Sequence, residues 1–411
     1  MTESPAAAAL PVPSRPLSSL DLKLQEHLDA LESQGLRRSL RTVDRRSGAI
    51  IHIGASSYVD FASNDYLGLA GDARIAAAAT DALRMDSTGS AAARSISGNH
   101  AVHEELERSI ASYKRTEAAL LFTSGYAANL GAIPALVKKG DAVYTDKLNH
   151  ASLIDGCRLS RAEVRIFPHR DIAALRQMLA MDTGFRSKMI VVDSVFSMDG
   201  DLFPLDALVD IAQESGAWTY VDDAHATGVL GDRGTGSVEH FGVEGKIDVV
   251  MGTLGKALGT AGAFIAGSKT LVQFLINRAR SFVFTTASPP AMAAATIEAI
   301  RIAQEEPWRR EKLRVNAERL RSALGSFLPD HCFETSSSPH ILPVVVGSST
   351  RVVQIGAELQ SRGLIVGVVR PPSVPLGTSR LRITSSAAHT EEQVDSLAHH
   401  LTQILRNTRV A

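Results

Sequence analysis

Seven short apolar runs recur between about residues 101 and 266, separated by segments with helical periodicity or by loops. Apolar runs of four or five residues bounded by turn residues are typical of strands buried on both faces, and their alternation with helices is typical of a parallel sheet. The pattern therefore predicts an α/β fold whose large domain holds a mostly parallel seven-stranded sheet covered by helices. The predicted strands are 119–122, 142–145, 164–167, 189–192, 218–221, 249–251 and 263–266.

The ends of the chain have a different pattern. The first residues hold four prolines and an alanine run, which predicts a disordered tail. A helix is predicted after Ser18, with Leu24, Leu28 and Leu31 on one face and Gly35 as its stop. The predicted division is a tail (1–18), an N-terminal helix and arm (19–60), a large domain (61–300) and a smaller α+β C-terminal domain (301–411) with strands 341–346, 364–369 and 380–383.

Composition excludes several classes of function. The 411 residues carry a net charge of −1 with both signs interspersed, so no basic surface for nucleic acid or an anionic membrane is predicted. No apolar run reaches the 18 residues that a membrane-spanning helix needs. The two cysteines lack metal-ligand or redox spacing, which favours reduced thiols in a cytoplasmic protein without a metal site.

Lys256 follows the predicted strand 249–251 in a loop that contains glycines. Burial disfavours the ammonium form of a lysine and so supplies the free amine that forms a Schiff base with an aldehyde. Thr253, three residues earlier, can donate a hydrogen bond to a phosphate oxygen. The alternative is an ordinary turn with a solvated lysine.

Asp222 ends the strand 218–221, and His225 follows three residues later. A carboxylate at the carboxyl edge of a sheet can keep a pyridinium nitrogen protonated, and the histidine then lies near a phenolic oxygen. Helix capping and a neutral structural histidine are the alternatives. Together with Lys256, the pair predicts pyridoxal 5'-phosphate (PLP) as the cofactor.

Three further groups follow other predicted strands. Ser124, Gly125 and Tyr126 form a turn that opens a helix, where backbone amides can converge on a phosphate. His150 can stack on a pyridine ring, and Ser197 can donate to its phenolic oxygen. Each motif alone is equally typical of an ordinary turn or of a structural histidine, but all three share a place at the carboxyl end of a strand.

Arg380 and Arg382 alternate on one predicted strand of the small domain and so share a face. A guanidinium is the expected partner of an amino-acid carboxylate. One of the two can serve as support for the other, and a solvated surface strand is the alternative.

The chain resembles the α-oxoamine synthases, fold type I PLP enzymes that condense an amino acid with an acyl thioester. The resemblance runs from about Leu20 to the end and is strongest in the segments 64–69, 196–201, 222–231 and 253–256. The segment 370–382 most resembles that of the members that join L-alanine to a pimeloyl thioester. The family works as a homodimer whose active sites are shared between subunits.

The resemblance implies roles for the matched residues. Lys256, His150, Asp222 and His225 are the implied catalytic residues: Lys256 forms the imine with PLP, Asp222 holds the pyridinium and His150 stacks on the ring. It also implies cofactor contacts from Ser124, Gly125, Tyr126, Ser197, His225 and Thr253, a contact from Thr285 to the neighbour's phosphate, and substrate contacts from Arg38, Asn64, Ser373 and Arg382.

The resemblance thus implies a decarboxylative condensation that yields 8-amino-7-oxononanoate, carbon dioxide and a free thiol in biotin biosynthesis. One alternative is a relative that joins glycine to acetyl-CoA, and another is a nucleotide-binding α/β module that uses the Gly125 turn without chemistry. Two departures from the family concern the substrate path. Residues 89–94 read Gly-Ser-Ala-Ala-Ala-Arg where the family has Gly-Ser-Gly-Gly-Ser-Arg, and Ala226 replaces a common glycine.

Overall fold

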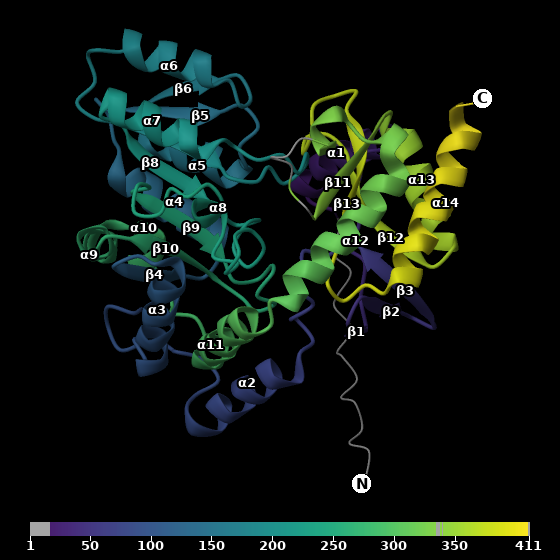
Figure 1. Cartoon of the computed structure of the whole chain (residues 1–411), viewed down its shortest axis with the longest axis horizontal. Helices are drawn as coiled ribbons and strands as arrows, with labels where there is room; N and C mark the ends of the chain where they lie inside the picture. Colours follow the sequence, from purple (N-terminus) through teal and green to yellow (C-terminus); the bar gives the residue numbers. More distant parts are fainter. Residues whose placement is uncertain (1–16, 334–337, 339, 410–411) are drawn as a thin grey trace.

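The computed structural model describes residues 17–333, 338 and 340–409, so the predicted tail lies almost wholly outside the described residues. Figure 1 shows two lobes, a larger one around the seven-stranded sheet and a smaller one that gathers both ends of the described chain. The helix α12 (Trp308–Leu324) runs from the larger lobe into the smaller one. No helix in the described part of the chain is long and apolar enough to cross a bilayer.

Helices and strands alternate along most of the described chain. The α-helices besides α12 are α1 (Ser19–Ser33), α2 (Ala73–Met85), α3 (Ala101–Lys114), α4 (Gly125–Leu136), α5 (Ala151–Ser160), α6 (Ile172–Met181), α7 (Leu205–Ser215), α8 (Ser237–His240), α9 (Lys269–Arg278), α10 (Arg280–Val283), α11 (Pro290–Glu305), α13 (Ser349–Ser361) and α14 (Glu391–Arg409). The strands are β1 (Arg45–Ser47), β2 (Ile50–Ile53), β3 (Ser56–Phe61), β4 (Ala118–Phe122), β5 (Ala142–Asp146), β6 (Glu163–Phe167), β7 (Lys188–Asp193), β8 (Trp218–Asp222), β9 (Val249–Thr253), β10 (Ala263–Gly267), β11 (Ile341–Gly347), β12 (Leu364–Val369) and β13 (Ser379–Thr384).

The larger sheet confirms the predicted seven strands. Its order is β4-β10-β9-β8-β7-β5-β6, and β10 alone runs antiparallel to its neighbours. Side chains alternate between the two faces of each strand. In β4, Leu120 and Phe122 pack in the layer of α4 and α9, whereas Leu121 packs with α3 and α11. Helices α6 and α7 cover the rest of that second face.

The smaller sheet joins segments from both ends of the described chain. Its order is β1-β2-β3-β12-β13-β11, and β3 pairs in parallel with β12. Phe61 of β3 belongs to the core that α12, α13 and α14 cover. The predicted strands of the small domain are present, but the hairpin β1–β2 was not predicted, because its strands are only three and four residues long and β1 consists of two arginines and a serine. Since the arm's strands pair with the C-terminal ones, we propose that they fold with the small domain.

Two local predictions are also confirmed. Ser18 caps α1 and accepts a hydrogen bond from the amide of Asp21. The sequence Thr390-Glu-Glu-Gln393 predicts a capping box before α14. It forms, because the amide of Thr390 donates to Gln393 Oε1 (3.0 Å) and the amide of Gln393 donates to Thr390 Oγ1 (3.3 Å). Both cysteines are buried free thiols.

Candidate active site

The carboxyl ends of five parallel strands bring most of the predicted residues to one edge of the larger sheet. Asp193 ends β7 directly opposite Asp222, which ends β8, and Asp222 lies opposite Met251 of β9. Carboxyl ends of parallel strands are where open α/β sheets bind ligands. The residues that follow these strands are Ser124, Gly125 and Tyr126 after β4, His150 after β5, Ser197 after β7, His225 after β8 and Lys256 after β9.

Lys256 contacts His225 at the centre of this edge. Its Nζ lies 2.9 Å from His225 Nε2. Burial lowers the pKa of Lys256 to about 8, against the opposing charge of Asp222. A sizeable fraction of free amine near neutral pH follows, which is the form that attacks an aldehyde.

Asp222 is buried and held by two donors. Asn129 Nδ2 donates to its Oδ2 (2.9 Å), and the amide of Ala224 donates to its Oδ1 (3.0 Å). Burial raises the pKa of Asp222, and burial together with the nearby charge of Asp222 raises that of Asp193 well above its usual range.

Arg382 reaches this edge from the smaller lobe. The buried guanidinium donates to the carbonyl of Ser197 and to Asn64 Oδ1 (3.1 Å). Among the described residues it has no carboxylate within ion-pair distance, so an anionic ligand could supply the missing charge. Arg380, on the same face of β13, is already paired with Asp199. The structure therefore separates the two arginines into one with a protein carboxylate and one without.

The turn before α4 has the features of a phosphate site. The first amides of a helix have no intrahelical acceptor, so those of Gly125 and Tyr126 are available to an anion. A Cβ at Gly125 would lie 2.8 Å from Thr253 Cγ2, too close for two carbon atoms. Glycine at this position thus allows Thr253, at the end of β9, to lie against the start of α4.

His150 precedes α5 with its ring exposed. Its backbone amide donates to Asp193 Oδ2 (2.6 Å), and its Nδ1 lies 2.7 Å from Ser152 Oγ. These contacts fix the orientation of the imidazole while one face stays open, as stacking on a planar ligand requires.

The remaining predicted residues lie apart from Lys256 within one chain. Arg38 Nη2 donates to Ser373 Oγ (3.1 Å), so these two contact each other. Among the described residues we find no hydrogen bond from either to the group around Lys256. Thr285 lines a small cavity together with Thr123, beside the end of β4.

An alanine in the segment 89–94 makes the local backbone conformation less favourable than a glycine would. Ala91 has a φ of 55°, a left-handed conformation that a glycine adopts without the steric cost of a methyl group. The segment is bound to residues 287–288, because Ser90 Oγ donates to the carbonyl of Ser288 (2.7 Å) and the amide of Ala287 to the carbonyl of Ala92 (3.0 Å).

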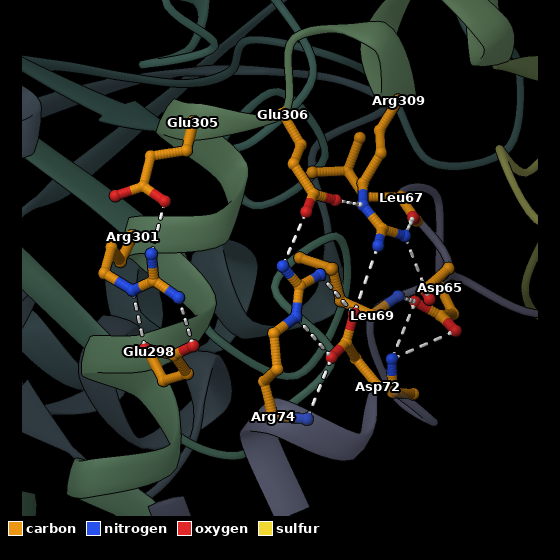
Figure 2. A network of polar contacts seen from close by, with 12 residues as sticks. Asp65, Leu67, Leu69, Asp72, Arg74, Glu298, Arg301, Glu305, Glu306 and Arg309 are labelled. Carbon is orange, nitrogen blue, oxygen red and sulfur yellow. Dashed lines mark hydrogen bonds and ion pairs between the residues drawn. The ribbon is translucent and has the colours of Figure 1, made fainter.

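A network of charged residues holds the turn that carries Asn64 (Figure 2). Asp65 accepts the amides of Leu69 (2.8 Å) and Ala70 (3.2 Å). Arg309 of α12 donates to the carbonyl of Leu67 (3.0 Å) and to Asp72 Oδ2 (3.1 Å). The turn is thereby fixed to both α2 and α12.

Replacing Asp65 with alanine should destabilise the fold by roughly 1–3 kcal/mol, because the buried amide of Leu69 loses its acceptor. Urea unfolding at pH 7 measures the change. Asp81→Ala serves as the control, since the Asp81–Arg84 pair is exposed and should contribute less than about 0.5 kcal/mol. Equal destabilisation by the two variants would contradict the proposed role of Asp65.

His169 holds the loop that carries Ser197. Its two nitrogens lie 3.0 Å from Asp146 Oδ1 and 2.6 Å from Asp201 Oδ2. Burial opposes protonation, but the hydrogen bonds and charges of the two aspartates outweigh it and raise the pKa of His169 to about 9. The imidazolium therefore joins the end of β5 to the loop after β7.

The contribution of His169 to stability should depend on pH. A group whose folded pKa is raised stabilises fully below its unfolded pKa of about 6.5, and this contribution is lost as pH rises through about 9. The difference in unfolding free energy between the wild type and His169→Gln should shrink by up to about 3 kcal/mol between pH 6 and 10. Urea titrations measure it. A difference that stays flat across this range would disprove the assignment.

The sequence analysis missed three residues of this site. Tyr66 lies inside the segment 64–69 and Asn129 lies on the helix that the Gly125 turn opens, yet neither was assigned a contact. Asp193 ends β7 as Asp222 ends β8, so the strand-end rule that selected Asp222 would also have selected it.

The residues present fit PLP on observations of the structure itself. The free helix amides beside Gly125 match a phosphate, and the buried carboxylate of Asp222 matches a ring nitrogen. The partly deprotonated amine of Lys256 matches an aldehyde. The buried guanidinium of Arg382, which has no protein carboxylate as a partner among the described residues, matches the carboxylate of an amino acid. This combination of donors lies at one edge of one sheet.

Comparison with known proteins agrees with this fit. The model of the family aminotransferase class I and II matches residues 56–401. An 8-amino-7-oxononanoate synthase of Anaeromyxobacter sp. (strain K) is 47% identical over 378 residues, 92% of this chain and 94% of that protein. Another, from Alkalilimnicola ehrlichii, is 46% identical over 389 residues, covering 94% and 98%.

A solved structure extends the likeness to three dimensions. Serine palmitoyltransferase from S. paucimobilis, determined with bound PLP and myriocin, superposes with a TM-score of 0.89 at 29% identity and covers 97% of this chain and 100% of that chain. The chain belongs to the aminotransferase class I and II family and, within it, to the group of the 8-amino-7-oxononanoate synthases.

Proposed function

We propose that this protein is a PLP-dependent acyltransferase that condenses L-alanine with a pimeloyl thioester to give 8-amino-7-oxononanoate, carbon dioxide and the free thiol. One observation carries the proposal: a lysine amine with a lowered pKa lies beside a buried carboxylate, in a chain 42–48% identical to 8-amino-7-oxononanoate synthases over more than 90% of its length. Biotin biosynthesis is the pathway that this reaction serves.

PLP, when bound, supplies an aldehyde for a lysine amine and a ring that takes up the electron pair released at the α-carbon of the amino acid. Lys256 provides the amine and afterwards removes the α-proton. Asp222 keeps a proton on the ring nitrogen, and His150 covers one face of the ring. The amides of Gly125 and Tyr126, with the hydroxyls of Ser124 and Thr253, bind the phosphate; Ser197 and His225 face the phenolic oxygen.

Substrate recognition falls to the smaller lobe and to the turn at Asn64. Arg382 and Asn64 bind the carboxylate of L-alanine, since Arg382 is buried without a protein carboxylate. A bond then forms between the α-carbon and the thioester carbonyl, the thiol leaves, and the carboxylate is lost as carbon dioxide. Arg38 and Ser373, which contact each other, bind the acyl substrate.

We propose further that the protein acts as a homodimer with shared sites, in which Thr285 approaches the partner's phosphate. Large apolar side chains support this, because Met85, Ile96 and Phe284 are 89%, 81% and 73% exposed in the single chain. Helix α1 buries none of its residues and leaves Leu24 and Leu28 exposed, as expected of a helix that packs on a second chain. Light scattering should give twice the mass of one chain. A cytoplasmic location stays a prediction.

A substrate panel tests the function. Purified protein with PLP should show a visible absorption band and should release thiol with L-alanine plus pimeloyl-CoA or a pimeloyl carrier protein. Thiol release only with glycine plus acetyl-CoA would identify the protein as a 2-amino-3-ketobutyrate ligase instead. A colourless protein that releases no thiol would overturn the proposal altogether.

A further inference from the structure

The hydroxyl group of Tyr66 connects the lysine of the site to its unpaired guanidinium. Tyr66 is fully buried, and its oxygen lies 2.7 Å from His225 Nδ1, 2.9 Å from Asn64 Oδ1 and 3.4 Å from Arg382 Nη2. His225 Nε2 in turn lies 2.9 Å from Lys256 Nζ. These contacts form one chain of hydrogen bonds from Arg382 to Lys256.

The guanidinium fixes the direction of this chain. An arginine has only donors, so the Asn64 atom that contacts Arg382 Nη1 at 3.1 Å is the amide oxygen. That oxygen can only accept from Tyr66, so the Tyr66 hydroxyl donates its single proton to Asn64 Oδ1. His225 Nδ1 consequently has no proton to accept from Tyr66 and must donate its own to the Tyr66 oxygen.

The tautomer of His225 follows from its lack of charge. Burial, and then the charges of Lys256 and Arg382, lower the pKa of His225 well below its usual range, so the imidazole is neutral. A neutral imidazole carries one ring proton, which lies on Nδ1, and Nε2 is left as an acceptor. The chain of hydrogen bonds ends on the amide oxygen of Asn64, which takes up no proton near neutral pH. These hydrogen bonds therefore orient the groups that they join and conduct no proton.

We propose that Tyr66 is a positioning residue that fixes His225 in its Nδ1-protonated tautomer, so that the bare Nε2 accepts a hydrogen bond from the amine of Lys256 and orients it. The inference rests on the proposed function in one respect, namely that Lys256 is the amine that reacts with PLP. The turn that carries Tyr66 is held by the network of Asp65 and Arg309 (Figure 2).

Tyr66→Phe isolates the hydroxyl group. The aromatic ring keeps its packing against His340, whose ring lies 4.2 Å away. Without the Tyr66 oxygen, a proton on His225 Nδ1 has no acceptor, so the other tautomer is favoured and Nε2–H faces Lys256. The ammonium form then loses an acceptor and the free amine gains a donor. The other ionisable groups around His225 and Lys256 are unchanged in the variant: Asp222 of β8, Asp193 of β7, His150 before α5, Arg382 of β13 and His340 before β11.

The pH dependence of cofactor capture measures this change. Full-length protein stripped of PLP is mixed with PLP, and the growth rate of the visible band is followed from pH 6 to 10. The midpoint should lie lower in Tyr66→Phe than in the wild type by roughly 0.5–1 pH unit, the shift expected for one hydrogen bond. Tyr144→Phe is the matched control, because that buried hydroxyl donates to Asp182 (2.8 Å), outside this site, and its midpoint should stay in place.

Nitrogen NMR of protein labelled with ¹⁵N-histidine observes the tautomer directly. The His225 signals, identified by their loss in His225→Gln, should show the proton on Nδ1 in the wild type and on Nε2 in Tyr66→Phe. Equal capture midpoints would overturn the inference. A wild-type spectrum with the proton on Nε2 would also overturn it, and that spectrum can be recorded even if the variant fails to fold. A wild type that forms no visible band with PLP would overturn the proposed function instead. The wild-type NMR spectrum would still decide the tautomer of His225 in that case.

Discussion

Lys256→Ala should eliminate the visible band of the PLP-loaded protein and reduce turnover by at least roughly 10²–10⁴-fold, the range attributed to a positioned proton-transfer group. The reason is that, in the proposed mechanism, Lys256 supplies both the amine that forms the Schiff base and the base that removes the α-proton. Its pKa of about 8 and its contact with His225 at 2.9 Å suit it to both tasks. Absorbance spectra and thiol-release assays measure the two effects.

Lys269→Ala provides the control for this substitution. Lys269 begins α9 on the exposed surface of the same lobe, so its loss should leave both band and turnover unchanged. Circular dichroism and thermal unfolding verify that each variant is folded. A Lys256→Ala protein that keeps the band and the turnover would disprove the assignment of Lys256.

Arg382→Ala should lower kcat/KM for the amino acid by roughly 10²–10³-fold, because removing one partner of a buried charge pair costs about 2–5 kcal/mol. The effect should be largely in the binding of the amino acid, since the guanidinium pairs with the carboxylate of the substrate. The visible band should persist, because Lys256 is intact. A spectral titration with L-alanine measures the dissociation constant beside the steady-state kinetics.

Arg380→Ala is the matched comparison on the same strand. Arg380 is already neutralised by Asp199, so its loss should change kcat/KM by less than about 10-fold. That small change would come from a shift of the loop that carries Asp199 and Ser197. Equal losses for the two variants would mean that Arg382 does not bind the substrate carboxylate.

Much of the larger sheet could be predicted because its strands are short apolar runs. A strand buried on both faces, such as β7, is apolar between its polar ends, and this run (189–192) is visible without knowledge of the neighbouring strands. The hairpin β1–β2 could not be predicted, since its strands are only three and four residues long, β1 is polar and both are partly exposed. The hairpin joins the smaller sheet through β3, and the pairing of β3 with β12 depends on a segment more than 300 residues away.

Lys256, Asp222 and His225 could be selected because each follows a predicted strand, and carboxyl ends of parallel strands meet at one edge. Their partners depend on three-dimensional neighbours. The contact of Asn129 with Asp222 joins residues 93 positions apart, and that of Tyr66 with His225 joins residues 159 apart. No local pattern encodes such distances.

The amino-acid sequence by itself determined the α/β class, the strand-end placement of the reactive side chains and the identity of the cofactor, because all three depend on residue type and on spacing along one segment. Only the tertiary structure decided which arginine is free for a ligand, which residues hold Asp222 and which groups surround His225. Those three properties depend on burial and on the charges of neighbours from distant segments, and such neighbours are brought together only when the two sheets fold against each other.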